Sequence, residues 1–250
     1  MCRLFLANRE GLDRLGPKGT EQVFEFLEAS MGGHGNGVAY VKKEKVYIRK
    51  GLKFPVSKAS KLAFNSCAEW FIFHTRWASM GEVSNQNCHP FQYGRIVAAM
   101  NGTEFGLRSL SRAMGEITDT EALVISIAAS SYHLPAIEIA KRFTELDSVF
   151  VGLIKQDKKY VPFASVGPAL GDLQVYQDKG AIIMASELPF VDETKVMNAI
   201  DGFYWAGGPV PEDSLVKMGA KNRIKRAKSI NRFYHEIPNY YGYYGSRGLR

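Results

Sequence analysis

The sequence predicts an α+β fold in which sheets and helices form packed layers. Three pairs of β-prone runs are each joined by a short polar turn, which is the pattern of β-hairpins. Two helical stretches stand between the strand pairs. Because a sheet or an amphipathic helix must cover its apolar face, we expect sheets packed on each other or under helices. The chain has no internal repeat or low-complexity linker, which indicates one domain over residues 1–216 and an extension over residues 217–250.

The first half of the chain carries strand signals on both sides of two helical segments. Thr20 can cap the first helix, because its hydroxyl can accept a hydrogen bond from a free backbone N–H. Uninterrupted β-branched and aromatic runs are typical of buried strands. The expected elements are a strand at 2–7, a helix at 20–31, a hairpin of 37–41 with 45–49, a short helix at 57–64, and strands at 70–74 and 96–100.

The second half begins with helices and ends with strands. Apolar residues recur at helical spacing in its first part, and β-prone runs follow across short polar turns. The expected elements are helices at 118–131 and 134–145, a hairpin of 148–155 with 160–165, a hairpin of 173–177 with 181–186, and a strand at 203–205.

Composition limits the class of protein. A hydrophobic content of 46% is enough for a buried core, and no run of 18 apolar residues suggests a membrane-spanning helix. The start of the chain lacks the basic and apolar regions of a signal peptide, so we expect a cytoplasmic protein. The three cysteines form no disulfide framework and no metal-binding pair, and we expect neither a metal nor a cofactor.

The net charge of +7 is concentrated at the C-terminal end. Residues 217–250 hold nine Lys or Arg side chains and one acidic side chain, Glu236, together with six Phe and Tyr residues. Basic residues mixed with aromatic ones could bind nucleic acid or an acidic protein surface. The simpler alternative is that the tyrosines pack on the domain and the basic side chains stay in water.

Cys2 is the residue with the most direct chemical meaning. Removal of Met1 would leave a free α-amine and a thiol on the same residue. An α-amine with a pKa of about 7.7–8.0 can take the proton of the thiol, which then acts as a nucleophile. The alternative is that Cys2 is an ordinary residue of a first strand.

A second group of polar residues follows the predicted central strands. Arg76 suits a carboxylate, because its planar fork of N–H groups can hold both oxygens. Asp119 suits an ammonium group, although it could simply be an acid at the start of a helix. Asn101 and Gly102 could donate hydrogen bonds to an oxyanion, although they also suit an ordinary turn. Together with Cys2, these residues could bind a free amino acid and attack its side-chain amide.

The chain resembles the class II glutamine amidotransferase domains, which are N-terminal-nucleophile hydrolases. Several motifs carry the resemblance, in the order and approximate spacing of that family. They are Met1-Cys2, the segment 74–79 (His-Thr-Arg-Trp-Ala-Ser), Asn87 with His89-Pro90, Asn101-Gly102, and the segment 118–121 (Thr-Asp-Thr-Glu).

The resemblance implies a four-layer α/β/β/α sandwich. It also implies hydrolysis of glutamine to glutamate and ammonia through a thioester on Cys2. Asn101 and the Gly102 N–H would form the oxyanion hole, Arg76 would hold the α-carboxylate, and Asp119 would hold the α-ammonium. The residues expected to bind substrate are Arg76, Trp77, Ser79, His89 and Asp119. His89, like His74, also suits packing or the anchoring of a loop.

The sequence departs from the family pattern in the loops around the expected site. Met80 stands where many members have His, in the loop that closes over glutamine. The segment 103–106 (Thr-Glu-Phe-Gly) replaces a more common apolar run followed by Glu-Asn. The segment 34–37 (His-Gly-Asn-Gly) is similar to a His-x-Asp-Gly loop of small stand-alone members, with Asn36 in place of Asp.

Little sequence remains after the hydrolase motifs to build a synthase domain. We therefore expect the chain to supply ammonia to a separate synthase partner, with residues 217–250 as a candidate docking segment. One alternative is a hydrolase that acts alone on a γ-glutamyl conjugate. Another is a non-enzymatic module that binds nucleic acid or protein through the basic extension.

Overall fold

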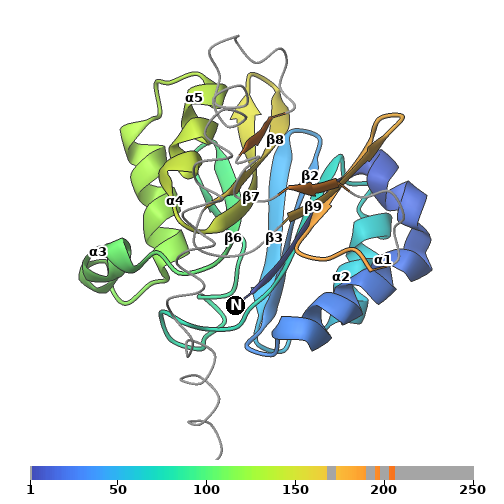
Figure 1. Ribbon diagram of the computed structural model, residues 1–250, viewed down its shortest axis with the longest axis horizontal. Coiled ribbons are helices and arrows are strands. Elements are labelled where there is room, and N and C mark those ends of the chain that lie inside the picture. The colour runs from blue at the N-terminus through green and yellow to red at the C-terminus, as the bar shows by residue number, and fades with distance from the viewer. Residues whose placement is uncertain (1, 168–172, 190–194, 198–202, 206–250) are drawn as a thin grey trace, which may run out of the picture.

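Two antiparallel sheets form the centre of the molecule (Figure 1). The computed structural model describes residues 2–167, 173–189, 195–197 and 203–205. The seven-stranded sheet has the order β11 (Lys195–Met197), β9 (Leu173–Asp178), β10 (Ala181–Ala185), β1 (Arg3–Asn8), β4 (Trp70–Thr75), β2 (Asn36–Lys42) and β3 (Lys45–Gly51). The five-stranded sheet has the order β12 (Phe203–Trp205), β8 (Lys159–Val166), β7 (Val149–Gln156), β6 (Ile96–Asn101) and β5 (Phe91–Tyr93).

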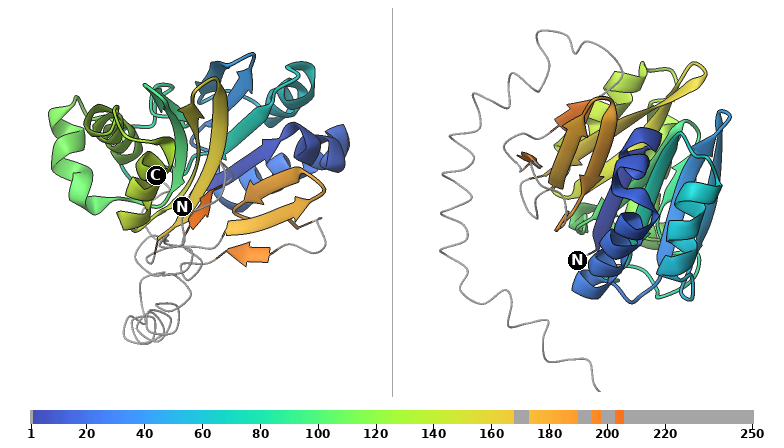
Figure 2. Two further views of the ribbon diagram at one scale, coloured as in Figure 1. Left: turned by 90° about the horizontal axis from the view of Figure 1, so that it is seen from above. Right: turned by 90° about the vertical axis from the view of Figure 1, so that its right-hand side faces the viewer.

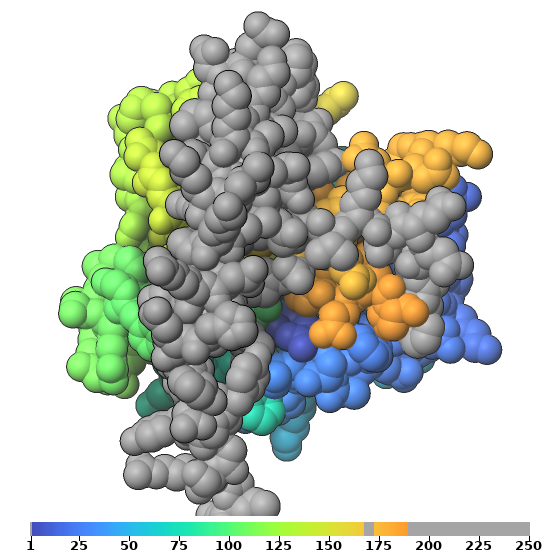
Figure 3. All heavy atoms as spheres, viewed as in Figure 1, coloured from blue at the N-terminus to red at the C-terminus, as the bar shows by residue number. Residues whose placement is uncertain are grey.

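Helices cover the outer face of each sheet (Figures 1 and 2). The seven-stranded sheet is covered by α1 (Arg9–Met31) and α2 (Val56–Asn65). The five-stranded sheet is covered by α4 (Asp119–Ser130), by α5 (Ala136–Lys141) and by the 3-10 turn η2 (Arg142–Glu145). A second 3-10 turn, η1 (Phe105–Leu107), leads into α3 (Arg108–Ala113), which packs beside α4. The space-filling view shows α3–α5 and α1 on opposite sides of the molecule (Figure 3). The predicted four-layer sandwich is confirmed.

Three buried apolar clusters hold these layers together. The first lies between the sheets and includes Leu6 and Ile72 from one sheet and Val151 from the other. The second joins the seven-stranded sheet to α1 and α2, where the Phe24 ring stacks on Phe73 at 4.2 Å between centroids. The third joins the five-stranded sheet to α4 and α5. Apolar side chains on both faces of the central strands explain why their sequences are nearly continuous hydrophobic runs.

The strands at 2–7, 70–74 and 96–100 and all three predicted hairpins are confirmed, with boundaries shifted by one or two residues. The first helix is longer than predicted: it begins at Arg9, where the Asn8 side chain accepts a hydrogen bond from the Gly11 N–H. Gly16, at φ 67° and ψ 170°, interrupts the helical backbone, and the predicted helix at 20–31 lies after this break. The last turn of the predicted helix at 134–145 is the 3-10 turn η2.

Several short elements were missed, because β5, η1 and α3 have only three to six residues each and give little periodic signal. The predicted strand at 203–205 is β12. The predicted domain end and the extension at 217–250 lie outside the described residues. None of the helices among the described residues is both long and apolar enough to cross a membrane.

Candidate functional site

The predicted site residues lie where several strands and one helix begin or end. Cys2 directly precedes β1, and Arg76 directly follows β4. The two strands are antiparallel with Arg3 opposite Thr75, so Cys2 and Arg76 are neighbours at the same edge of the sheet. In the facing sheet β6 ends at Asn101, and Asp119 is the first residue of α4. Since β1 packs against β6, the fold brings these four residues to one end of the sandwich.

The Cys2 thiol is buried and interacts with the backbone of Trp77. The Trp77 N–H donates to Cys2 Sγ at 3.4 Å, and Sγ lies 3.6 Å from the Trp77 carbonyl oxygen. Burial raises the pKa of the Cys2 thiol. The Asp119 carboxylate raises it further, whereas the Trp77 N–H and the Arg76 charge lower it. The thiol therefore stays protonated in this surrounding unless a base takes its proton.

The Arg76 side chain is almost fully buried at 2% exposure. Its Nη1 donates to the Glu82 carbonyl oxygen at 2.7 Å, and its Nη2 donates to the carbonyls of Met80 at 2.8 Å and Gly81 at 3.3 Å. The guanidinium thus fixes the loop that follows it. Arginine has five N–H donors, and Arg76 Nε makes no hydrogen bond to any described residue. The same side chain can therefore hold this loop and still offer a donor to a carboxylate.

The segment after Arg76 is also fixed by His34. The backbone of Arg76 is bonded to residues 34 and 35, with its N–H donating to the Gly35 carbonyl at 2.8 Å. His34 Nδ1 accepts from the Ala78 N–H at 2.9 Å, and its ring stacks on Trp77 at 4.7 Å. We did not assign a role to His34 from the sequence. Its place in the segment 34–37 is the only signal that could have indicated one.

Trp77 and Ser79, both predicted to line the substrate site, lie at its outer side. The Trp77 side chain is 45% exposed, and Ser79 Oγ lies 2.6 Å from Thr103 Oγ1. This hydroxyl pair joins the loop after β4 to the loop after β6, and Thr103 is the first residue of the segment 103–106 that departs from the family pattern.

Asn101 and Gly102 end β6 in a conformation that only glycine adopts easily. Gly102 has φ 142°, and a Cβ atom added there would lie 2.2 Å from Ser148 Oγ. The buried Oδ1 of Asn101 has no hydrogen-bond partner among the described residues. The backbone N–H of Gly102 and the amide of Asn101 are the donor types that stabilise an oxyanion.

Asp119 is buried and is fixed by the backbone around it. Its Oδ2 accepts from the Glu104 N–H at 2.8 Å, and its Oδ1 accepts from the Thr120 N–H at 2.9 Å. Burial raises the pKa of Asp119, and these N–H groups act in the opposite direction. Glu104 in turn accepts from the N–H groups of Asp147 at 3.0 Å and Ser148 at 2.8 Å. Sequence reasoning missed this role, because a lone Glu after a turn usually indicates an exposed charge.

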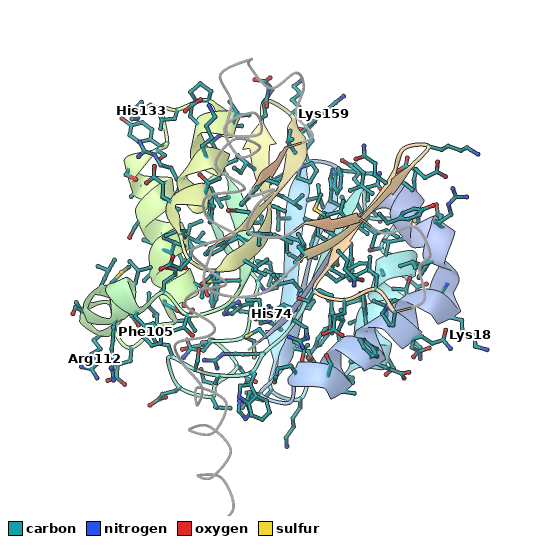
Figure 4. All side chains as sticks on the ribbon, in the orientation of Figure 1. Lys18, His74, Phe105, Arg112, His133 and Lys159 are labelled. Atoms are coloured by element: carbon teal, nitrogen blue, oxygen red, sulfur yellow. The ribbon has the colours of Figure 1, made fainter. Side chains whose placement is uncertain are left out.

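His74 and His89 lie together beneath the site (Figure 4 labels His74, at the centre of the molecule). Their rings stack at 4.1 Å between centroids, and both side chains are buried. His74 Nε2 lies 3.1 Å from the Met100 carbonyl oxygen, and His89 Nδ1 lies 3.5 Å from the Met100 nitrogen. His89, predicted to bind substrate, therefore contacts the backbone next to Asn101.

The site has no obvious place for a metal ion. Within the described part of the chain, no group of three or more His, Cys, Asp or Glu side chains could hold one. The chemistry supported by the residues present is acid–base and nucleophilic, with a thiol, a guanidinium, a carboxylate and amide donors close to one another.

Comparison with known proteins finds similarity in structure but not in sequence. No protein-family model and no curated protein matches the chain. Glutamine phosphoribosylpyrophosphate amidotransferase from B. subtilis matches over 82% of this chain and 49% of its own, with 18% identity and a TM-score of 0.53. A structure described as the allosteric regulatory enzyme of purine biosynthesis matches 82% of this chain and 48% of its own, with 19% identity and a TM-score of 0.57.

A glutamine aminotransferase class-II domain protein from Silicibacter pomeroyi matches over 82% of this chain and 98% of its own, with 14% identity and a TM-score of 0.48. The chain spans about half the length of the two larger enzymes. Its fold is that of the glutamine amidotransferase domains, the N-terminal-nucleophile hydrolase fold that the sequence motifs predicted.

Proposed function

We propose that this chain hydrolyses the side-chain amide of glutamine, with Cys2 as the nucleophile after removal of Met1. One observation carries the proposal. Cys2 and Arg76 are neighbours at the ends of two paired strands, and the charges of Arg76 and Asp119 both act on the thiol. A thiol that is near both a cation and a carboxylate fits an amino acid substrate that carries the two opposite charges.

Recognition of glutamine would use its charged end. Arg76 would hold the α-carboxylate with the N–H group that the loop carbonyls leave unused. Asp119 would accept hydrogen bonds from the α-ammonium on an oxygen lone pair that its two backbone donors leave free. Trp77 and Ser79 would border the bound substrate. Since Arg76 and Asp119 are both buried, the low local dielectric would strengthen the electrostatic attraction of each one to the substrate.

The reaction would proceed in two steps. The α-amine of Cys2 takes the thiol proton, and the sulfur forms a bond with the amide carbon while Asn101 and the Gly102 N–H stabilise the oxyanion. The carbon–nitrogen bond then breaks, and the α-ammonium returns the proton to the leaving nitrogen, which departs as ammonia. Water, activated by the same amine, cleaves the thioester, so that glutamine and water yield glutamate and ammonia.

The ammonia would serve a separate synthase. This part of the proposal is supported by the similarity in fold to a glutamine phosphoribosylpyrophosphate amidotransferase, whose name describes the transfer of an amide nitrogen to an acceptor. Residues 217–250, with a charge of +8, are the candidate segment for docking the synthase. Deletion of residues 217–250 should abolish co-purification with the synthase and leave basal glutaminase activity unchanged. Unchanged co-purification would contradict this docking role.

The test of the hydrolase function is intact mass before and after treatment with 6-diazo-5-oxo-L-norleucine, a reactive glutamine analogue. We expect a chain that lacks one methionine and takes up one covalent adduct. Cys2→Ala should take up no adduct. Cys67→Ala is the matched control, because Cys67 is also a free cysteine but is exposed, and this variant should be labelled like the wild type.

The other outcomes point to the other functions. If the processed chain takes up no adduct but hydrolyses γ-glutamyl conjugates faster than glutamine, the substrate is a γ-glutamyl conjugate and not glutamine. An unprocessed and unreactive chain would contradict the hydrolase. If that chain bound nucleic acid with a steep salt dependence, the basic extension would be its functional part.

A further inference from the structure

Among the described residues, the end of β6 has no strand neighbour on one side. On the other side, the ladder between β6 and β7 continues to Asn101, which pairs with Val149. The ladder between β6 and β5 stops earlier, at Ala98 paired with Phe91. In an antiparallel sheet, residues two apart face the same neighbour, so the backbone of Met100 faces the side where β5 has ended. Buried N–H and C=O groups at this point need other partners.

The imidazoles of His74 and His89 supply these partners. The Met100 carbonyl oxygen lies 3.1 Å from His74 Nε2, and the Met100 nitrogen lies 3.5 Å from His89 Nδ1. A carbonyl oxygen can only accept, so His74 Nε2 must carry a hydrogen. A backbone N–H can only donate, so His89 Nδ1 must be free of hydrogen and its proton must be on Nε2. The contacts therefore require a defined tautomer at each ring.

The surroundings hold both rings neutral. Burial lowers the pKa of His74 to about 3; the contact with the Met100 carbonyl acts in the opposite direction, and the nearby cations Arg76 and Lys50 lower the pKa further. Burial also lowers the pKa of His89 well below its usual value, with His74, Arg76 and Lys50 as further causes. A proton on His89 Nδ1 would remove the only lone pair that can accept from the Met100 N–H. The neutral state is thus the one that the geometry needs.

Gly37 allows the backbone at His89 to pack directly against the seven-stranded sheet. Gly37 pairs with His74 in the ladder between β2 and β4. A Cβ atom at Gly37 would lie 2.0 Å from the His89 carbonyl oxygen, so the segment passes directly over a strand position without a side chain. The close packing of the His89 backbone on Gly37, which pairs with His74, holds the two imidazoles side by side at the end of β6.

We propose that His74 and His89 are positioning residues, which bind the Met100 peptide from both of its polar groups and so fix the direction of Asn101 and the Gly102 N–H. This inference rests on the proposed function, because those donors matter only if an oxyanion forms. In this role His89 acts through the backbone and does not touch the substrate. Loss of either contact should lower kcat and leave KM nearly unchanged, because glutamine is bound by other groups.

The test uses Asn and Gln, which imitate different ring nitrogens. A Gln side chain places its NH2 near the position of Nε2, and an Asn side chain places its oxygen near the position of Nδ1. We expect His74→Gln and His89→Asn to keep most of the activity. His74→Asn and His89→Gln should lose kcat by roughly 10- to 100-fold, less than the 10²–10³ typical for deletion of an oxyanion donor.

All four variants lose the stacked rings, so a purely structural role predicts the same preferred substitute at both positions. A preference for Gln at position 74 and for Asn at position 89 is the result that supports positioning. Suppose that the wild-type chain is active and that all four variants are equally active, or that Gln is the better substitute at both positions. Either result would overturn the positioning role and leave the proposed function standing. Wild-type chain that hydrolyses neither glutamine nor a γ-glutamyl anilide would overturn the proposed function itself.

A second measurement does not depend on activity or on folded variants. Imidazole ¹⁵N shifts of the wild-type chain should show that the rings of His74 and His89 are neutral, both with hydrogen on Nε2, from pH 8 down to pH 5. A ring with hydrogen on Nδ1, or a ring that becomes charged between pH 8 and pH 5, would contradict the positioning contacts.

Discussion

The nucleophile and the oxyanion donors lie on facing strands that are fixed in different ways. β1 lies between β10 and β4, and its ladder with β4 reaches Arg3, next to Cys2. Its ladder with β10 stops at Phe5, and Ser186 continues that side: the Ser186 N–H donates to the Leu4 carbonyl at 2.9 Å, and Ser186 Oγ accepts from the Leu4 N–H at 2.9 Å. β6 has a full ladder only with β7, and its other side is completed by His74 and His89. Backbone ladders do not depend on side-chain identity. We therefore expect the oxyanion side to be more sensitive to single substitutions than the sheet edge beside Cys2.

The largest expected effect tests the backbone at the end of β6. Gly102→Ala should lower kcat by about 10²–10³, the usual cost of losing an oxyanion donor. The cause is a Cβ atom at 2.2 Å from Ser148 Oγ and a φ of 142°, which Ala does not tolerate. Steady-state kinetics with glutamine measure this effect.

The matched control is Gly106→Ala, four residues further along. A Cβ atom there has no described neighbour within 4 Å, so its kinetics should equal those of the wild type. If Gly102→Ala were as active as Gly106→Ala, the oxyanion side would not be the sensitive one.

The second effect concerns Arg76, which lies beside the nucleophile but acts through its side chain. Arg76→Lys should raise KM for glutamine by about 100-fold, because a lysine cannot hold the loop carbonyls and a carboxylate with one planar fork. The rise in KM should be absent with 4-aminobutanamide, an analogue of glutamine that has no α-carboxylate. An equal loss with both compounds would assign Arg76 to the loop alone.

The third effect is a dependence of stability on pH. The pKa of His74 in the folded chain is about 3, below the value of about 6.5 in an unfolded chain. Between these values the unfolded state binds more protons, so stability falls as pH falls, by about 1.4 kcal/mol per pH unit below 6.5. Urea unfolding at pH 7, 6 and 5 measures this slope.

His74→Gln should make the slope shallower, because the buried imidazole is gone. The control is His133→Gln at an exposed position near α5 (Figure 4), which should keep the wild-type slope. Equal slopes for the wild type and His74→Gln would mean that His74 is not held neutral by its surroundings.

The smallest effect tests a side-chain contact on the Cys2 side. Arg3 Nη2 lies 3.0 Å from Glu187 Oε1, and the Glu187 side chain is 39% exposed. Glu187→Gln should reduce the free energy of unfolding by less than about 1 kcal/mol, as is typical of exposed ion pairs, and leave kcat unchanged. A loss of kcat as large as that of Gly102→Ala would remove the difference between the two sides.

Local patterns in the sequence predicted most of the fold. Continuous apolar runs predicted the central strands, and β-prone runs across polar turns predicted the hairpins. The weak points were equally local. Gly16 and Pro17 obscured the first half of α1, since both residues usually end a helix, and here Gly16 only interrupts it. The three-residue strand β5 is too short to show a period.

The sequence by itself determined the candidate chemistry: a thiol at Cys2, Arg76 and Asp119 as opposite charges, and Asn101 with Gly102 as donors. These types and their order can be recognised one motif at a time. Only the tertiary structure decided that Arg76 holds the carbonyls of residues 80–82, that Glu104 binds the two residues before β7, and that two imidazoles complete the end of β6. The physical reason is that each contact depends on strand register and on the facing of two sheets, which bring together groups that the sequence keeps far apart.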